Sequence, residues 1–209
     1  MKILIADDHT VFREGLKRIF AEAADIAEIG EASNAQQLLE RVAEKRWDVV
    51  LLDISMPGKS GLEVLKEIKQ MNPRLAVLVL SMHSERQFAV RVIRAGAAGY
   101  LTKGAAAKEV LHAIRKVYRD GKYISESVAE HLVMAVGQNT DRPLHESLSD
   151  REFEVLRMIG AGRTVSEIAE ELSLSVKTVS TYRTHILEKM NLKNNAELML
   201  YVITNRLLE

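Results

Sequence analysis

The sequence predicts an α/β domain with helices on both faces of a parallel sheet, followed by a smaller all-helical domain. Up to about residue 121, short apolar runs alternate five times with helix-period segments. After residue 148 no strand candidate remains, and four helix-period segments follow one another. Between these parts lies the polar stretch GQNTDRPLHES, which holds a proline and has no periodicity. We therefore expect domains over residues 1–121 and 148–209, joined by a linker over 122–147 with one short helix, SESVAEHLVMAV.

Each element of the first domain follows from its pattern. The expected strands are aliphatic runs at residues 2–6, 26–32, 49–53, 75–81 and 98–103. The expected helices show amphipathic spacing at residues 11–23, 35–45, 61–71, 85–95 and 106–119. Because each strand is followed by a helix, the pattern predicts a (βα)5 doubly wound parallel sheet.

The second domain is expected to hold four helices and no strand. The helix-period segments are residues 151–161, 165–172, 176–190 and 195–207. The stretch SLSDRE supplies a capping box for the first of them, because Ser149 is followed three residues later by Glu152.

Composition excludes several classes of protein. The chain of 209 residues is 47% hydrophobic and 28% charged, which is ordinary for a soluble globular protein. It has no cysteine, which excludes disulfides and thiolate chemistry. No apolar run is long enough to span a membrane, and the start, MKILIADDH, lacks a signal-peptide pattern, so we expect a cytoplasmic protein with no membrane partner. The net charge of zero neither suggests nor excludes a polyanionic partner.

Polar residues of complementary chemistry stand at the carboxyl ends of four of the predicted strands. They are Asp7 and Asp8, Asp53, Ser81 and Lys103. In an open parallel sheet the ligand site lies beyond the carboxyl ends of the strands. Three converging carboxylates repel one another unless a cation joins them, and Mg²⁺ is the natural hard ion. Together with a lysine and a hydroxyl, they predict a phosphoryl-transfer site in which one carboxylate could form an aspartyl phosphate.

These motifs carry a resemblance. DDH after the first strand, LLDISMPGKSG after the third, LS ending the fourth and AGAAGYLTK at the fifth resemble the receiver domain of bacterial two-component response regulators. The resemblance covers residues 1 to about 120. It implies that Asp53 is the phosphoacceptor. It also implies that Asp7, Asp8 and Asp53 hold Mg²⁺ with help from the backbone carbonyl of Ser55.

The same resemblance assigns three further residues. It implies that Ser81 is the switch hydroxyl, Tyr100 the switch aromatic and Lys103 the counter-ion of the phosphoryl group. The family usually has proline after this lysine, whereas Gly104 follows here.

Two other classes fit the pattern poorly. A phosphatase with an aspartate nucleophile generally needs a second acid two residues after it, and Ser55 stands there. A nucleotide-binding Rossmann enzyme needs G-x-G-x-x-G after the first strand, which is absent.

The stretch TVSEIAEELSLSVKTVSTYRTHILEKMNL, residues 164–192, predicts a helix-turn-helix. Two short amphipathic helices are joined by SLS, and the second has a polar outer face. Between residues 175 and 195, four basic residues face a single acid, which leaves a charge of about +3; they are Lys177, Arg183, Lys189 and Lys193, against Glu188. Three small polar residues in the same helix suit close approach to a groove: Ser180, Thr181 and Thr184.

The segment LSDREFEVLRMIGAGRTVSEIAEELSLSVKTVSTYRTHILEKMNLKNNAEL is similar to the LuxR-type DNA-binding domain over its whole length. Its fusion to a receiver is the architecture of the NarL/FixJ family. The resemblance implies that three residues lie on the phosphate side, namely Lys177, Thr178 and Arg183. It implies that three others face bases, namely Ser180, Thr181 and Thr184. Tyr182 is equally compatible with packing and with backbone contact. The histidines follow no metal-ligand spacing, so His9 and His185 are expected to make local polar contacts.

The combined prediction is a DNA-binding response regulator. Its expected partners are a sensor histidine kinase that phosphorylates Asp53, double-stranded promoter DNA and, once phosphorylated, a second copy of the chain. It is not expected to be an enzyme beyond its own phosphorylation from phosphodonors and its own dephosphorylation. A protein-interaction module is the competing class, which the basic second helix disfavours. The stripe of Leu198, Val202 and Leu207 is either core or a dimer face, and core is the preferred interpretation.

Overall fold

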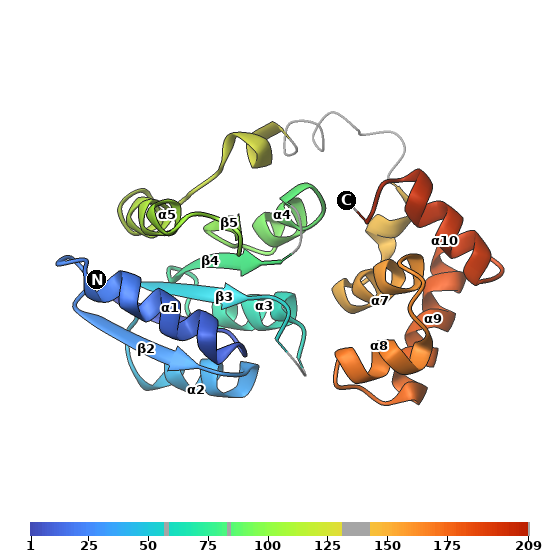
Figure 1. Ribbon diagram of the computed structural model, residues 1–209, viewed down its shortest axis with the longest axis horizontal. Helices are drawn as coiled ribbons and strands as arrows, with labels where there is room; N and C mark the ends of the chain where they lie inside the picture. Colours follow the sequence, from blue (N-terminus) through green and yellow to red (C-terminus); the bar gives the residue numbers. More distant parts are fainter. Residues whose placement is uncertain (57–58, 83–84, 131–142, 209) are drawn as a thin grey trace. The chain divides into compact units, whose positions relative to one another are not determined.

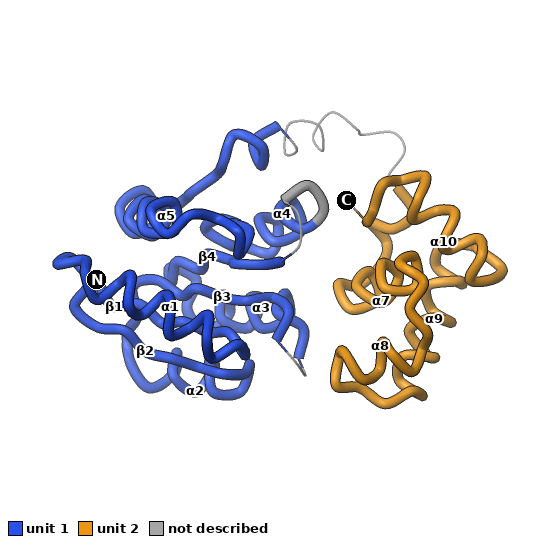
Figure 2. The backbone as a smooth tube through the Cα atoms, viewed as in Figure 1, with its two compact units in different colours: residues 1–136 blue, residues 137–209 orange. Residues whose placement is uncertain are grey.

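The computed structural model describes residues 1–56, 59–82, 85–130 and 143–208 (Figure 1). The chain divides into two compact units, residues 1–136 and 137–209, which Figure 2 shows in different colours. Of the short helix expected within the linker, residues 126–130 are helical, and the part from residue 131 onward lies outside the described residues.

The first unit is a parallel sheet in which each strand is followed by a helix. Its elements are β1 (Lys2–Ala6), α1 (Thr10–Ala21), β2 (Glu28–Ala32), α2 (Ala35–Glu44), β3 (Val49–Asp53), α3 (Gly61–Met71), β4 (Ala76–Ser81), α4 (Glu85–Arg94), β5 (Gly99–Thr102) and α5 (Ala107–Asp120). The strand order is β2-β1-β3-β4-β5, and all neighbouring pairs are parallel. The predicted doubly wound sheet is confirmed.

The central strands are aliphatic because both faces of the sheet are covered. Successive side chains of a strand point to opposite faces. One set packs with α1 and α5 in a single buried cluster that includes Ile3, Ile5, Val49, Leu51, Leu78 and Leu80. The alternate set, also buried, includes Leu4, Val50, Leu52, Val77 and Val79. These side chains point to the opposite face of the sheet, away from α1 and α5. Because both faces are buried, consecutive strand residues are all apolar, which explains runs such as VVLL.

Parallel pairing brings all the strand ends to one edge. Asp53 in β3 is level with Leu80 in β4, and Ser81 is level with Thr102 in β5. The Lys103 N–H donates to the Ser81 carbonyl at 2.7 Å, just beyond that pair. The residues that follow β1, β3, β4 and β5 therefore meet at the carboxyl edge.

The second unit is helical, as predicted. Its elements are a 3₁₀ helix η1 (Leu144–Ser147), which the sequence did not reveal, then α7 (Asp150–Gly160), α8 (Val165–Glu171), α9 (Val176–Met190) and α10 (Asn195–Thr204). Each of the four α-helices contributes to one apolar core, whose fully buried members include Phe153, Leu156, Ile168, Val179, Ile186 and Val202. Gly160 lets α7 approach α10 closely, because a Cβ there would lie 2.4 Å from Val202.

The expected capping box at the start of α7 is confirmed. The Glu152 N–H donates to Ser149 Oγ at 3.3 Å, and the Ser149 N–H donates back to Glu152 Oε2 at 2.7 Å. The same carboxylate accepts hydrogen bonds from the Lys189 ammonium, which ties α7 to α9. Glu152 therefore both starts one helix and joins it to another.

Several element ends differ from the prediction by one to three residues, and two of these differences have clear local causes. β2 begins at Glu28 rather than at residue 26, because the Ile26 N–H closes a turn onto the Ala23 carbonyl. α10 ends at Thr204 rather than at residue 207, because Arg206 adopts a φ of 51° and the chain leaves the helix. No helix within the described ranges is long and apolar enough to cross a membrane.

Candidate functional site

The first candidate site is the acidic pocket at the carboxyl edge of the sheet. The Lys103 ammonium lies 2.7 Å from Asp53 Oδ2 and 2.7 Å from Asp7 Oδ2. All three side chains are at most 5% exposed. The other Asp53 oxygen accepts the Ser55 N–H at 2.9 Å. One buried cation thus bridges two carboxylates from different strands, as expected from the strand ends.

Asp8 and His9 complete an oxygen-rich cluster. Asp7, Asp8, His9 and Asp53 offer ligand atoms that all lie within 4.8 Å of one another. Asp8 Oδ1 is buried and accepts no hydrogen bond within the described parts of the chain, although His9 Nδ1 lies 2.9 Å away. Three carboxylates face one lysine, which leaves two negative charges. A buried carboxylate oxygen that accepts no hydrogen bond, together with a charge of −2, fits a hard divalent cation such as Mg²⁺.

Burial and charge shift the two central groups in the same direction. Burial raises the pKa of Asp53 above its ordinary value of 3.8, and the hydrogen bond from Lys103 only partly offsets this. Burial would lower the pKa of Lys103, but its hydrogen bonds to Asp53 and Asp7 outweigh that effect and raise it. The Lys103 ammonium is therefore stabilised in its charged form. The ionised form of Asp53 is destabilised by burial, so a further cation nearby would stabilise it.

The two expected switch residues lie in the adjoining strands. Ser81, at the end of β4, and Tyr100, in β5, are both 0% exposed. Tyr100 is level with Val79 in the sheet. Ser55, the expected carbonyl ligand, lies two residues after the end of β3. Its Oγ is buried and has no hydrogen bond in the described structure. The peptide bond between Lys103 and Gly104 is trans.

Three further side chains border the pocket, and two of them, Phe12 and Arg13, were not predicted from the sequence. The His9 N–H donates to Asp7 Oδ1 at 2.8 Å, so His9 makes the local polar contact expected, yet it also belongs to the ligand cluster. Arg13 Nη1 donates to the Asp7 carbonyl at 2.6 Å. The Phe12 ring lies 4.9 Å from Lys103 Nζ. His9 was noted beside the acidic pair but expected only to make a local contact, whereas nothing in a single sequence singles out positions 12 and 13.

The second candidate site is the outer surface of α9. Four of the six expected DNA-contacting residues are exposed, and these are Lys177, Ser180, Thr181 and Thr184. Thr178 and Arg183 are half-buried, as is Tyr182. The small polar residues therefore do lie on an accessible surface of the second helix of the helix-turn-helix.

Hydrogen bonds within the second unit constrain several of these side chains. Thr181 Oγ1 donates to the Lys177 carbonyl at 3.0 Å, and Thr184 Oγ1 donates to the Ser180 carbonyl at 3.1 Å. Their hydroxyl hydrogens are therefore occupied, which leaves oxygen lone pairs and methyl groups facing outward. Thr178 Oγ1 lies 2.8 Å from Ser175 Oγ at the N-cap of α9.

Arg183 joins two helices. Its Nε donates to Asn195 Oδ1, on the first residue of α10, at 2.5 Å. Its guanidinium is thus positioned by a contact that the sequence pattern did not predict.

The apolar residues of α10 divide into two faces. Leu198 and Val202 are 0% exposed and Leu207 is 6% exposed, so the stripe noted in the sequence belongs to the core, as preferred. A different pair, Leu200 and Ile203, is 65% and 62% exposed on the outer face.

An acidic strand-end pocket in one domain and a helix-turn-helix in the next define a signalling regulator that binds DNA. Family comparison agrees. Residues 3–115 match the response regulator receiver domain, and residues 146–202 match the bacterial regulatory proteins of the luxR family. The chain is 38% identical to the response regulator UvrY of Escherichia coli K12 over 200 residues, covering 95% of this chain and 91% of that one. It is 36% identical to the response regulator GacA of Pseudomonas aeruginosa over 211 residues, covering 100% and 98%.

Solved structures show the same architecture. RcsB of Salmonella enterica serovar Typhimurium, bound to promoter P1flhDC with the phosphomimetic BeF₃⁻, is 27% identical with a TM-score of 0.64, covering 97% of this chain and 98% of that one. An RcsB–DNA complex gives a TM-score of 0.60 at 27% identity, covering 97% of each chain. This chain belongs to the two-component response regulators of the NarL/FixJ type, which join a receiver to a LuxR-type DNA-binding domain. It acts as a DNA-binding phosphoacceptor regulator rather than as a conventional enzyme.

Proposed function

We propose that Asp53 is the phosphoacceptor and that a sensor histidine kinase is the phosphodonor. The observation that carries this assignment is the bridge from Lys103 to the buried carboxylate of Asp53, beside two further carboxylates. Burial of a carboxylate costs desolvation free energy, and buried groups with a shifted pKa, such as Asp53, cluster at functional sites.

The proposed reaction forms a phosphorus–oxygen bond and breaks a phosphorus–nitrogen bond. An Asp53 oxygen attacks the phosphorus of a phosphohistidine, and the imidazole nitrogen leaves with the electron pair and takes up a proton. With acetyl phosphate the leaving group is acetate, so the chain would catalyse its own phosphorylation. Attack of water on the aspartyl phosphate reverses the modification. Lys103 stays within reach of the phosphoryl oxygens and neutralises their charge.

The proposed cation ligands are Asp7, Asp8, Asp53 and the carbonyl of Ser55. Mg²⁺, when bound there, supplies positive charge beside the phosphoryl oxygens. The residual charge of the pocket and the buried Asp8 oxygen that accepts no hydrogen bond support this set. His9 Nδ1, 3.2 Å from Asp7 Oδ1, orients one of these carboxylates.

The proposed switch involves Ser81 and Tyr100. The Ser81 hydroxyl would donate to a phosphoryl oxygen, and Tyr100 would fill the space that Ser81 leaves. Support comes from the link between the Ser81 carbonyl and the Lys103 N–H, which couples the end of β4 to the lysine. The phosphoryl group adds charge and acceptors, so it stabilises the arrangement that satisfies them.

The proposed DNA-reading surface is α9. Lys177 and Arg183 would contact phosphates, as would Thr178 near the start of the helix. Three exposed residues would face base edges: Ser180, Thr181 and Thr184. Because both threonine hydroxyls already donate to the backbone, they would accept hydrogen bonds from base amino groups or place methyl groups against thymine.

The proposed active form is a homodimer on paired half-sites of promoter DNA. Its half-sites would lie about one helical turn, roughly 10 base pairs, apart. The exposed Leu200 and Ile203 on α10 supply an apolar face for pairing of the DNA-binding domains. We assign the receiver to residues 1–121, the linker to 122–147 and the DNA-binding domain to 148–209, and we place the protein in the cytoplasm.

The assignment of Asp53 is tested by mass spectrometry after incubation with acetyl phosphate and Mg²⁺. Asp53→Ala should gain no phosphoryl mass, whereas Asp25→Ala, which alters an exposed carboxylate, should gain it as the parent chain does. Full phosphorylation of Asp53→Ala would refute the assignment. Genome-wide DNA occupancy with and without phosphodonor then tests whether modification controls promoter binding.

A further inference from the structure

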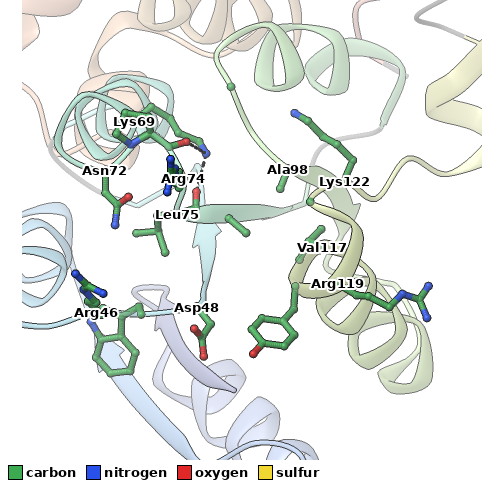
Figure 3. Close-up of a pocket in the computed structure, with 16 residues that line it drawn as sticks. Arg46, Asp48, Lys69, Asn72, Arg74, Leu75, Ala98, Val117, Arg119 and Lys122 are labelled. Carbon is green, nitrogen blue, oxygen red and sulfur yellow. Dashed lines mark hydrogen bonds between the residues drawn. The ribbon is translucent and has the colours of Figure 1, made fainter.

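A second cavity lies at the amino-terminal edge of the sheet, opposite the acidic pocket. Its volume is about 910 Å³, within the range typical of small-molecule sites. The residues just before or at the start of β3, β4 and β5 line it, together with the ends of α3 and α5 (Figure 3). All lining residues belong to the receiver unit.

The lining is strongly cationic. Four cations, Arg46, Lys69, Arg74 and Lys122, share the cavity with one acid, Asp48. A fifth cation, Arg119, points away from the cavity in Figure 3 and is paired with Asp120 at 2.7 Å. Asp48 Oδ2 accepts the backbone N–H of Lys2 at 2.7 Å, so this carboxylate already has a partner.

Two of the ammonium groups are held only by backbone carbonyls. Lys69 Nζ donates to the Leu75 carbonyl at 2.6 Å, and Lys122 Nζ donates to the Ala97 carbonyl at 2.8 Å. Neither has a carboxylate partner among the residues that the structure describes. Figure 3 shows them reaching toward each other from opposite sides of Ala98. Burial and then the charge of Lys122 lower the pKa of Lys69, as expected for cations that lack an anion.

The helix ends at this edge do not cancel the positive charge. α3 and α5 both end beside the cavity, and each helix carboxyl terminus carries roughly half a negative charge. Two such termini supply about −1, whereas four cations and one carboxylate leave a surplus of three positive charges. The cavity therefore retains a net attraction for anions.

We propose that this cavity binds a small polyphosphate, an anion with two or more linked phosphoryl groups, between Lys69 and Lys122 with Arg46 and Arg74 at its rim. Several separated cations suit a chain of phosphoryl groups better than a single one. The ring of Tyr118, which is 54% exposed, also lines the cavity and offers a surface for a nucleoside attached to such a chain. This site is separate from the phosphoacceptor pocket and does not depend on its assignment.

Trp47 makes the test direct because it is the only tryptophan of the chain and lines the cavity. Its fluorescence is titrated with sodium triphosphate, without Mg²⁺ and at constant ionic strength. We expect a saturable change in the parent chain. Lys122→Gln should weaken the apparent affinity about fivefold or more, because one charge contact is lost. Lys108→Gln removes the same charge from an exposed position outside the cavity and should leave the affinity unchanged.

The Lys122 ammonium donates one hydrogen bond, to the Ala97 carbonyl, within the described part of the chain, so Lys122→Gln is expected to fold; an unchanged far-ultraviolet spectrum checks this. As a second measurement, triphosphate should raise the melting temperature of the parent chain more than that of Lys122→Gln. The proposal is overturned if fluorescence shows no saturable change up to roughly 5 mM triphosphate, which would mostly fill a millimolar site. An equal loss in Lys122→Gln and Lys108→Gln also overturns it.

Adenosine triphosphate distinguishes the two sources of the phosphate chain. Equal affinities for inorganic triphosphate and the nucleotide support recognition of the phosphoryl groups alone. If the nucleotide binds more tightly than triphosphate, and Tyr118→Leu removes this difference in affinity, the result supports a nucleotide site. Equal responses to triphosphate and to sulfate at matched ionic strength would show a general salt effect and contradict the proposal.

Discussion

Lys189 donates its ammonium hydrogens to both carboxylate oxygens of Glu152, at 2.9 and 2.6 Å. Burial alone would raise the pKa of Glu152, but Lys189 and the Ser149 N–H hold it below the ordinary value of 4.5. Since the folded pKa is lowered, this interaction stabilises the domain above pH 4.5, and that stability is lost as the pH falls through the folded pKa.

We therefore expect Glu152→Gln to destabilise the DNA-binding domain by about 1 to 3 kcal/mol at neutral pH. Glutamine keeps the capping box, so the loss isolates the contact with Lys189. Hydrogen exchange of α7 amides in the full chain measures it, and the difference from the parent should shrink as the pH falls below 4.5. The Glu152→Gln variant and its parent are compared in a background that carries His185→Gln. This removes the contribution of the His185 ring, whose Nδ1 lies 3.7 Å from the Glu152 carboxylate. Glu188→Gln, at an exposed acid of α9, is the control, and a difference that does not depend on pH would contradict the mechanism.

A second prediction concerns the metal. Asp8→Asn should weaken Mg²⁺ binding by about tenfold or more, because it removes the carboxylate whose oxygen has no other hydrogen bond. Calorimetric titration measures the affinity, and Glu126→Gln, an exposed acid outside the pocket, should bind Mg²⁺ as the parent chain does. Removal of Mg²⁺ by a chelator should also prevent phosphorylation by acetyl phosphate. Unchanged affinity in Asp8→Asn would exclude Asp8 from the ligand set.

A third prediction separates positioning from base reading on α9. Lys177→Ala should weaken binding equally for an operator selected from random DNA and for unselected DNA, and lower the salt slope by roughly one unit. Thr184→Leu should cost roughly 1 to 3 kcal/mol on the operator and change the preferred bases, with little effect on unselected DNA. Isotherms across a salt series on both DNAs measure this, with Lys108→Ala as the charge control. A base-specific loss confined to Lys177→Ala would reverse the assignment.

Arg183 provides a sharper case within the same helix. The Nε of Arg183 donates a hydrogen bond to Asn195, so Arg183→Ala should lower both DNA affinity and the stability of the domain. Lys177→Ala should lower DNA affinity alone. Thermal unfolding measured beside the isotherms distinguishes the two. Equal stability of the two variants would show that the Asn195 contact contributes nothing measurable.

A further prediction concerns dimerisation through α10. Leu200→Glu should weaken phosphorylation-dependent dimerisation on paired half-sites by about tenfold or more, because it places a charge on the exposed apolar face. Sedimentation with DNA measures the assembly. Leu144→Glu, at another exposed leucine of the same unit, is the matched control. Parent-like dimers of phosphorylated Leu200→Glu would exclude this face.

The fold and the acidic pocket could be predicted because their signals are local. A run of aliphatic residues predicts each strand, and the polar residue of the site lies at the end of that run. Parallel pairing of the strands is then enough to bring Asp53 and Lys103 together. The stripe of Leu198 and Val202 could be assigned to the core of α10, but the exposed apolar pair of Leu200 and Ile203 could not be predicted, because the run LMLYVI is apolar all round. The contact from Arg183 to Asn195 and the cationic cavity are assembled from separate elements, and no short motif marks them.

The acidic pocket and the cationic cavity of the receiver domain also give this domain a dipole moment. The chain has no net charge, yet acidic groups gather at one edge of its sheet and cationic groups at the other. Such a separation makes the domain a dipole, which experiences a torque in the field of a charged partner before the two surfaces touch. Occupation of the acidic edge by a divalent ion reduces that moment. Encounter rates with charged partners should accordingly depend on ionic strength and on metal loading even though the overall charge is zero.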